Sequence, residues 1–126
     1  MATLELTEEN FNETIENNDI VIVDFWAPWC GPCKSFAPTF EAASESHPDV
    51  VFAKVNTEDE TELAQGCSIR SIPTLMLFRQ KILLFNEAGA LAPAQLEDMV
   101  AKVKELDMDQ VRASMAEAEA EQAQGE

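Results

Sequence analysis

A continuous run of apolar residues, broken by a single acid, is the feature that most constrains how this chain folds. Residues 20–26 are Ile-Val-Ile-Val-Asp-Phe-Trp, so large and β-branched side chains follow one another without polar alternation. A run of this kind is typical of a strand that is buried on both of its faces. Strands buried on both faces belong to parallel sheets that are covered by helices. The run therefore predicts an α/β fold.

A helix is predicted before this strand. Thr7 is a suitable N-cap because acids follow it directly, and Leu6 and Phe11 are placed to form a hydrophobic staple across the helix start. We expect this helix to run to about Asn17 and to stop in the polar Asn-Asn-Asp segment that begins there.

After the strand, the pattern alternates between helix and strand. A helix is expected to follow residues 27–33 and to run to about Ser46, with Pro38 kinking it. Residues 50–55 form a second strand, so the unit is β-α-β with a right-handed crossover. A short acidic helix is expected near residues 57–65.

The second half of the sheet is predicted to be a hairpin. Residues 74–78 and 82–85 are apolar, and only residues 79–81 separate them, which forces an antiparallel pair. Pro93 then opens a last helix, which carries apolar residues at helical spacing as far as Leu106. A β-α-β unit, a hairpin and a helix together predict an α/β fold with a central mixed β-sheet flanked by helices on both faces.

Length and composition indicate one domain with a C-terminal extension. The 126 residues are close to the usual size of a single domain, and residues 1–106 hold all the predicted core elements. Residues 107–126 are acidic and rich in alanine and glutamate, with one basic residue. We expect this extension to be weakly helical or disordered, with Asp107 as a cap, Val111 and Met115 on one side, and disorder in the final Gln-Gly-Glu.

The charge balance excludes several classes of function. Eight Lys and Arg residues against 24 Asp and Glu give a net charge of −16, which repels phosphate backbones and anionic lipid. We therefore expect no nucleic-acid partner and no membrane partner. The apolar runs are far shorter than the ~20 residues of a membrane span, and acids stand where a signal peptide carries bases. The predicted location is the cytoplasm, a reducing compartment.

Two cysteines just after the buried strand carry the predicted chemistry. The segment Trp29-Cys30-Gly31-Pro32-Cys33 lies at the start of a predicted helix, where unpaired N–H groups and the helix dipole stabilise a thiolate. Cys30 lies nearer the exposed end and is the expected nucleophile. Cys33 lies one turn inside and is the expected resolving thiol. Pro32 suits the first helical turn because it has no N–H group to pair.

Three segments resemble the thioredoxin family in their order and separation. They are Trp-Cys-Gly-Pro-Cys at 29–33, Val-Asp-Phe-Trp-Ala at 23–27 and Arg-Ser-Ile-Pro-Thr at 70–74, and the resemblance covers residues 3 to about 106. It implies a thioredoxin fold and a protein-disulfide reductase that contributes to cell redox homeostasis through a Cys30–Cys33 pair. The dipeptide between the cysteines resembles that of the reducing members of the family.

The resemblance also implies roles for residues around the cysteines. Asp24 matches the family's buried carboxylate, which relays the proton of Cys33, and Lys54 matches its lysine partner. Pro73 matches the family's cis-proline, beside which a substrate strand pairs with the backbone of Ile72. The implied substrate-binding residues are Trp29, Gly31, Pro32, Ile72, Pro73, Gly89 and Ala90.

Partners and cofactors are implied by the same resemblance. The expected substrates are client proteins that contain a disulfide. No metal or organic cofactor is expected to be bound, since the redox-active group is the Cys30–Cys33 disulfide itself. The expected electron donor is an NADPH-dependent, flavin-containing thioredoxin reductase, and the protein is expected to act as a monomer.

Some features depart from the family or leave alternatives open. The hairpin turn at 79–81 contains no glycine, so its type is open. Cys67 stands where the family often has an aromatic residue, and we interpret it as a small buried side chain, with a regulatory thiol as the alternative. Alternatives to a general reductase are a binding module or holdase, a dedicated electron donor to one enzyme, and a zinc protein with Cys30, Cys33, His47 and Cys67 as ligands.

Overall fold

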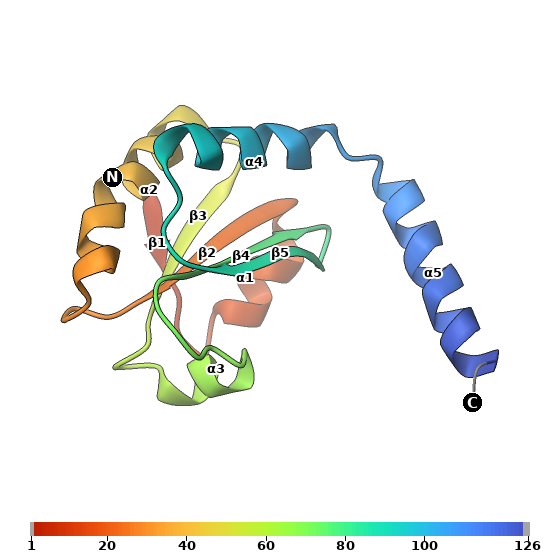
Figure 1. Cartoon of the computed structure of the whole chain (residues 1–126), viewed down its shortest axis with the longest axis horizontal. Helices are drawn as coiled ribbons and strands as arrows, with labels where there is room; N and C mark the ends of the chain where they lie inside the picture. Colours follow the sequence, from red (N-terminus) through yellow and green to blue (C-terminus); the bar gives the residue numbers. More distant parts are fainter. Residues whose placement is uncertain (1, 125–126) are drawn as a thin grey trace.

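The computed structural model describes residues 2–124 as a layered α/β domain from which a C-terminal helix projects (Figure 1). The elements follow the chain in the order β1 (Thr3–Glu5), α1 (Phe11–Asn17), β2 (Ile20–Trp26), α2 (Gly31–Ser46), β3 (Val51–Asn56), α3 (Thr61–Gly66), β4 (Thr74–Arg79), β5 (Ile82–Ala88), α4 (Pro93–Glu105) and α5 (Met108–Gln124). The last residues of the extension, Gly125 and Glu126, lie outside the described part of the chain, and so does the end of the segment expected to be disordered.

The described strands form a five-stranded mixed sheet in the order β1-β3-β2-β4-β5. β2 lies at the centre, parallel to β3 and antiparallel to β4, and β5 pairs antiparallel with β4. Within this register Asp24 of β2 lies opposite Lys54 of β3 and Leu75 of β4. The expected mixed sheet is confirmed, and its central strand is the apolar run at residues 20–26.

Alternate side chains of β2 point to opposite faces of the sheet, and each face has its own core. Ile20 and Ile22 belong to a core that includes the buried phenylalanines of α2 and the buried residues of α4. Val21, Val23 and Phe25 belong to a second core that includes those of α1 and packs against Leu63 of α3. Because both faces are covered, β2 has no solvated side, which explains why its sequence lacks polar alternation.

The N-terminal segment differs from its predicted structure in two ways. The first helix begins at Phe11 with Asn10 as its N-cap, so the prediction that Thr7 caps it is wrong. Residues 8–10 form a turn instead, because the Asn10 side chain accepts a hydrogen bond from the Thr7 amide at 2.6 Å. In addition, residues 3–5 form the edge strand β1. This strand was not predicted, because three residues are too few to show a strand pattern in the sequence.

The hairpin between β4 and β5 closes through two residues that have positive φ angles. Gln80 and Lys81 have φ values of 51° and 72°, as a two-residue type I′ turn requires, although neither is glycine. The Gln80 amide donates to the carbonyl of Asp19 at 2.8 Å, which ties the turn to the chain just before β2. β5 continues to Ala88, three residues beyond its predicted end, and its pairing with β4 shifts register between Leu77 and Phe78 of β4.

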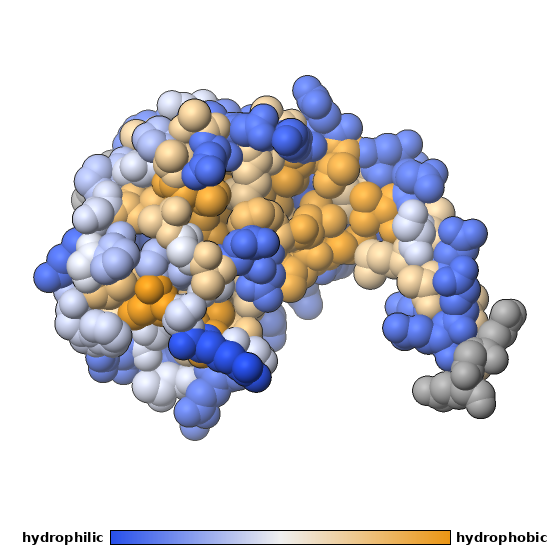
Figure 2. Space-filling view, viewed as in Figure 1, coloured by the Kyte–Doolittle hydropathy of each residue, from blue (hydrophilic) through white to orange (hydrophobic). Residues whose placement is uncertain are grey.

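The described part of the C-terminal extension forms one helix, α5, over Met108–Gln124. Asp107 caps α5 as expected, since its Oδ1 accepts hydrogen bonds from the amides of Asp109 and Gln110. Met108 is buried, so the extension contributes one side chain to the domain. Beyond it α5 projects away from the sheet, and Figure 2 shows a hydrophobic patch in the angle between α5 and the domain.

Candidate active site

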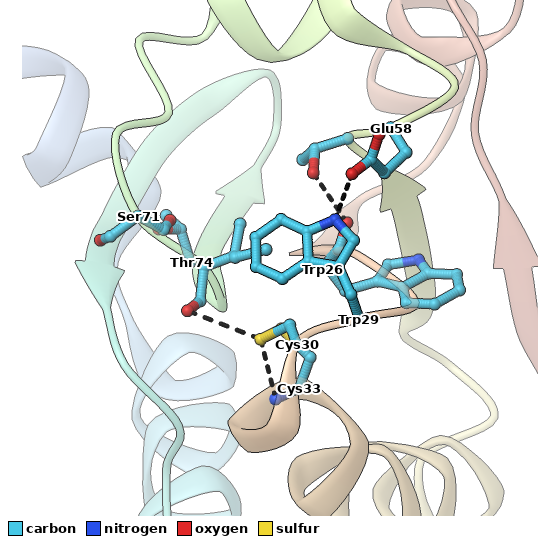
Figure 3. Close-up of a disulfide and its surroundings, with 9 residues drawn as sticks. Trp26, Trp29, Cys30, Cys33, Glu58, Ser71 and Thr74 are labelled. Atoms are coloured by element: carbon cyan, nitrogen blue, oxygen red, sulfur yellow. Dashed lines mark hydrogen bonds between the residues drawn. A yellow bond between two sulfur atoms is a disulfide. The ribbon is translucent and has the colours of Figure 1, made fainter.

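The two cysteines of the Trp-Cys-Gly-Pro-Cys segment are joined as a disulfide at the start of α2 (Figure 3). Cys30 is the N-cap of α2 and has extended backbone angles, while Pro32 occupies the first helical turn. The Cys33 amide donates a hydrogen bond to Sγ of Cys30 at 3.2 Å. The chain thus passes from β2 into the start of α2, where Sγ of Cys30 takes the place of the side-chain oxygen that usually caps a helix.

The helix start favours negative charge on Cys30 over Cys33. The first amides of a helix have no partner within it, and the helix dipole places partial positive charge there. When the disulfide is open, an anionic Cys30 sulfur would therefore be stabilised by the Cys33 amide. Burial does not separate the two residues, since Cys30 is 4% exposed and Cys33 is 2% exposed in the closed form.

A second loop lies against the disulfide. The Ile72–Pro73 peptide bond is cis, as the resemblance implied, and the Ile72 carbonyl oxygen lies 3.8 Å from Sγ of Cys30. Gly89, at the end of β5, donates its amide to the Pro73 carbonyl at 2.8 Å and has a φ angle of 107°. This loop and the end of β5 are therefore fixed relative to the cysteines. Ala90 follows Gly89 and is exposed.

A groove of about 340 Å³ opens beside the disulfide. Its lining includes Trp29 and Ile72 from the expected set, together with Thr57, Ala64, Ile69, Arg70 and Ser71. Trp29 is 67% exposed, and its indole N–H donates to the Glu58 carboxylate, which holds the ring at the edge of the groove (Figure 3). The expected rim residues Gly31 and Pro32 are also exposed.

Sequence reasoning missed Glu58 and most of the groove lining. Thr57 and Glu58 follow β3 where a short acidic helix was expected near residues 57–65, but the structure has a turn at residues 57–59 and α3 begins only at Thr61. Arg70 belongs to the Arg-Ser-Ile-Pro-Thr segment, but its place in the same lining as Trp29 depends on how two distant loops meet. No spacing within the sequence relates these residues to one another.

Asp24 lies in β2 with the parity of Ile20 and Ile22, so it faces the side of the sheet that α2 covers. Its side chain is 1% exposed, and within residues 2–124 neither carboxylate oxygen has a hydrogen-bond partner. Burial raises the pKa of Asp24 from 3.8 to about 7, and the nearby Lys54 charge offsets part of that rise. A carboxyl group with this pKa exchanges protons near neutral pH.

Lys54 lies beside Asp24 on the neighbouring strand. The two residues are register partners in the parallel β2–β3 pair, and the Lys54 Nζ lies 4.7 Å from the centroid of the Trp26 ring. The Lys54 ammonium group thus lies over the Trp26 ring, and Trp26 packs against the cluster that contains both cysteines.

The Thioredoxin family model matches residues 2–105. The chain belongs to the thioredoxin family. Among its relatives, "Putative thioredoxin 2" of Streptomyces coelicolor is 51% identical over 120 residues, which is 95% of this chain and 90% of the relative. "Thioredoxin" of Alicyclobacillus acidocaldarius is 42% identical over 103 residues, which is 81% of this chain and 98% of the relative.

Solved thioredoxin structures have the same fold. Thioredoxin 3 from the mitochondria of Saccharomyces cerevisiae, in its oxidised form, has a TM-score of 0.73 at 32% identity and covers 79% of this chain and 94% of its own. The thioredoxin of Plasmodium falciparum has a TM-score of 0.73 at 33% identity, covering 79% of this chain and 98% of its own. Its membership of this family and its Cys-x-x-Cys disulfide together identify the chain as a thiol–disulfide oxidoreductase.

The residues considered as a zinc site are dispersed in the structure. His47 stacks on Phe52 and its Nε2 contacts the Glu97 carboxylate of α4. Cys67 is half-buried and packs against the core on the face of the sheet that α1 covers. This burial raises the pKa of the Cys67 thiol. Across residues 2–124, no three His, Cys, Asp or Glu side chains gather as a metal site would need. The interpretation of Cys67 as a packing residue stands as a proposal.

Proposed function

We propose that this chain reduces disulfides in client proteins by dithiol exchange. The Cys30 thiolate attacks one sulfur of the client disulfide, forming a mixed disulfide and releasing one client thiolate. The Cys33 thiolate then attacks the Cys30 sulfur, which restores the intramolecular disulfide and releases the second client thiolate. Two electrons pass from the cysteine pair to the client. The observation that carries this assignment is the Cys33 amide directed at Sγ of Cys30.

Clients would bind across the groove beside the disulfide. An extended client segment can pair with the Ile72 backbone, because Pro73 has no N–H group that would compete for the same edge. The exposed Trp29 ring offers apolar contact area to the residues that flank the client cystine. The proposed substrate-binding residues are Trp29, Gly31, Pro32, Ile72, Pro73, Gly89 and Ala90.

Asp24 is proposed to relay the proton of Cys33. Cys33 must lose its proton inside the protein, where bulk water is excluded, and the buried carboxylate on the α2 side of β2 has a pKa near 7 that suits the transfer. Lys54 is proposed as the partner that keeps this pKa from rising further. We expect Asp24→Asn to slow the resolving step in stopped-flow kinetics with a model disulfide while sparing the first attack. Unchanged resolution at pH 7 would remove Asp24 from the mechanism.

The electron donor, the cellular location and the oligomeric state are proposed from the family and from the net charge of the chain. The reaction needs no bound cofactor, and an NADPH-dependent thioredoxin reductase is the proposed electron donor for the oxidised pair. We propose a cytoplasmic monomer that acts on neither nucleic acid nor membranes, in line with its net charge of −16. Among the helices of residues 2–124, none is long and apolar enough to span a bilayer.

We propose that residues 1–106 form the catalytic domain and that residues 107–126 form a separate extension. Support comes from the family match, which ends at residue 105 where α4 ends. The burial of Met108 indicates that α5 begins directly against the domain, without a flexible linker after α4.

A disulfide-reduction assay tests the proposed function. Reduction of insulin by dithiothreitol should be accelerated by the wild type and not by Cys30→Ser. The binding-module alternative predicts equal behaviour of the two proteins, since docking needs no dithiol. Cys33→Ser should accumulate mixed disulfides with clients, because the first attack remains and resolution is lost. A small set of trapped proteins, rather than many, would favour a dedicated electron donor.

A further inference from the structure

Among the residues that the structure describes, one charged side chain lines the groove beside the disulfide. It belongs to Arg70, and the remaining lining residues are aromatic, aliphatic or hydroxyl-bearing. Arg70 is exposed and lies two residues before Ile72, whose carbonyl oxygen is 3.8 Å from Sγ of Cys30. The loop that carries Ser71, between these two residues, lies beside Cys30 (Figure 3). The redox mechanism described above gives Arg70 no role.

The reach of Arg70 covers the client residues next to the attacked cysteine. Successive Cα atoms are about 3.8 Å apart, so the Cα of Arg70 lies within about 7 Å of the Cα of Ile72. A client segment that pairs with the Ile72 backbone is extended and spans about 3.3 Å per residue. The long side chain of Arg70 therefore reaches client positions within about three residues of the cysteine.

The guanidinium group of Arg70 has no ion pair and no hydrogen bond within residues 2–124. The other two arginines are engaged, since Arg79 donates to the Val103 carbonyl at 2.7 Å and Arg112 pairs with Asp109 at 2.7 Å. Acidic partners are abundant in this chain, which has 24 acids against eight bases. Guanidinium groups bind carboxylates through two parallel hydrogen bonds. The donors of Arg70 are therefore free for a carboxylate that enters the groove.

Acids of residues 58–62 stand near the same groove but do not pair with Arg70. The Glu58 carboxylate accepts the indole N–H of Trp29 and is not part of the lining. Glu60 accepts a backbone amide from the segment before α1 at 2.9 Å. The other acids of this segment are exposed and also lie outside the lining. They oppose a client carboxylate in general, so any preference for one must come from direct contact with Arg70.

We propose, resting on the reductase function proposed above, that Arg70 selects client segments that carry a carboxylate within about three residues of the attacked cysteine. The client's Asp or Glu side chain accepts hydrogen bonds from the guanidinium group while the segment pairs with the Ile72 backbone. Clients without such an acid remain substrates, because the disulfide chemistry does not use Arg70. The preference depends on where the acid stands along the client, since a carboxylate that lies toward Glu58 is repelled instead.

A set of short peptides tests this preference with the full reduced chain. Each peptide has about nine residues and a central cysteine that is joined by a disulfide to thionitrobenzoate, a coloured leaving group. The Cys30 thiolate attacks the peptide sulfur and thionitrobenzoate leaves, so its release reports the first step alone. A single glutamate is placed at each flanking position in turn, with glutamine at that position as the reference. The measured quantity is the ratio of the two release rates at about 0.15 M salt, where distant charges are screened.

The ratio is compared between variants. At one flanking position, or at two that share a strand face, the glutamate-to-glutamine ratio of the wild type should exceed that of Arg70→Gln about threefold, the effect of one exposed ion pair. Arg70→Lys keeps the charge and should keep part of the preference. Lys81→Gln is the matched control, because it removes the same charge from the exposed hairpin turn. Its ratios should stay within about 1.3-fold of the wild type at every position.

Other outcomes would overturn the proposal. Equal ratios for the wild type and Arg70→Gln at every position would show that Arg70 does not contact the client carboxylate. An equal drop in Lys81→Gln would show that the peptides respond to the net charge of the chain. A preference lost in Arg70→Lys as completely as in Arg70→Gln would show that positive charge at residue 70 does not select the client. Failure of the reductase function itself is a different result, in which the glutamine peptides release thionitrobenzoate no faster with the wild type than with Cys30→Ser.

Discussion

Replacing Asp24 by asparagine removes the charge of one buried carboxylate while keeping its shape. In the wild type this side chain is 1% exposed, and no hydrogen bond within the described chain reaches either oxygen. Ionisation in such a place is unfavourable, because water is lost and only the Lys54 charge compensates. We therefore expect Asp24→Asn to stabilise the fold above pH 3.8, with the full effect above about pH 7.

The pKa of Asp24 sets the size and the pH range of the effect. Below pH 3.8 the carboxyl group is protonated in both the folded and the unfolded chain, so it contributes nothing to the difference between wild type and variant. Between 3.8 and about 7 the unfolded chain ionises while the folded chain keeps its proton, so the stability of the wild type falls as pH rises. Complete loss of this contribution amounts to about 4 kcal/mol above pH 7.

Urea denaturation of the oxidised proteins from about pH 4 to about pH 8 measures this difference. The free energy of unfolding of Asp24→Asn should exceed that of the wild type by under about 1 kcal/mol at pH 4 and by about 4 kcal/mol at pH 8. Asp59→Asn is the control, because Asp59 is exposed and the substitution is the same. A stabilisation by Asp24→Asn that is constant across this pH range would refute the assignment of a buried carboxyl group with a raised pKa.

Three further outcomes are expected. Cys30→Ser should abolish insulin reduction, whereas Cys67→Ser should keep most of it, and equal loss in both would contradict the two-cysteine mechanism. Gly89→Ala should lower the stability of the fold by about 1 kcal/mol in thermal melts, because Gly89 has a φ of 107°. Gly31→Ala is the control and should cost less, since an added Cβ meets no neighbouring atom at either position and Gly31 has no positive φ. Met108→Ala should destabilise the domain by about 2 kcal/mol in urea, and a change under about 0.5 kcal/mol would show that the extension does not pack on it.

The chemistry of the active site could be predicted because it depends on neighbours in sequence. Cys30, Pro32 and Cys33 fall where a buried strand passes into a helix, and a helix start presents free amides whatever the rest of the fold does. Asp24 could be predicted for the same reason, since one acid within a strand buried on both faces has no solvated side to occupy. The groove could not, because its lining comes from helix α3 and from loops that are far apart in the sequence.

The projecting helix shows a different limit of sequence reasoning. Alanine and glutamate favour a helix at residues 108–124, but nothing local sets the direction in which that helix leaves the domain. Its direction depends on the hairpin turn, where the Gln80 amide binds Asp19 and its side chain contacts Arg112. The turn that the sequence left undefined therefore also orients the extension. Since an exposed contact of this kind stabilises by about 1 kcal/mol at most, burial of Met108 fixes the base of α5 more strongly than the contact between Arg112 and Gln80 does.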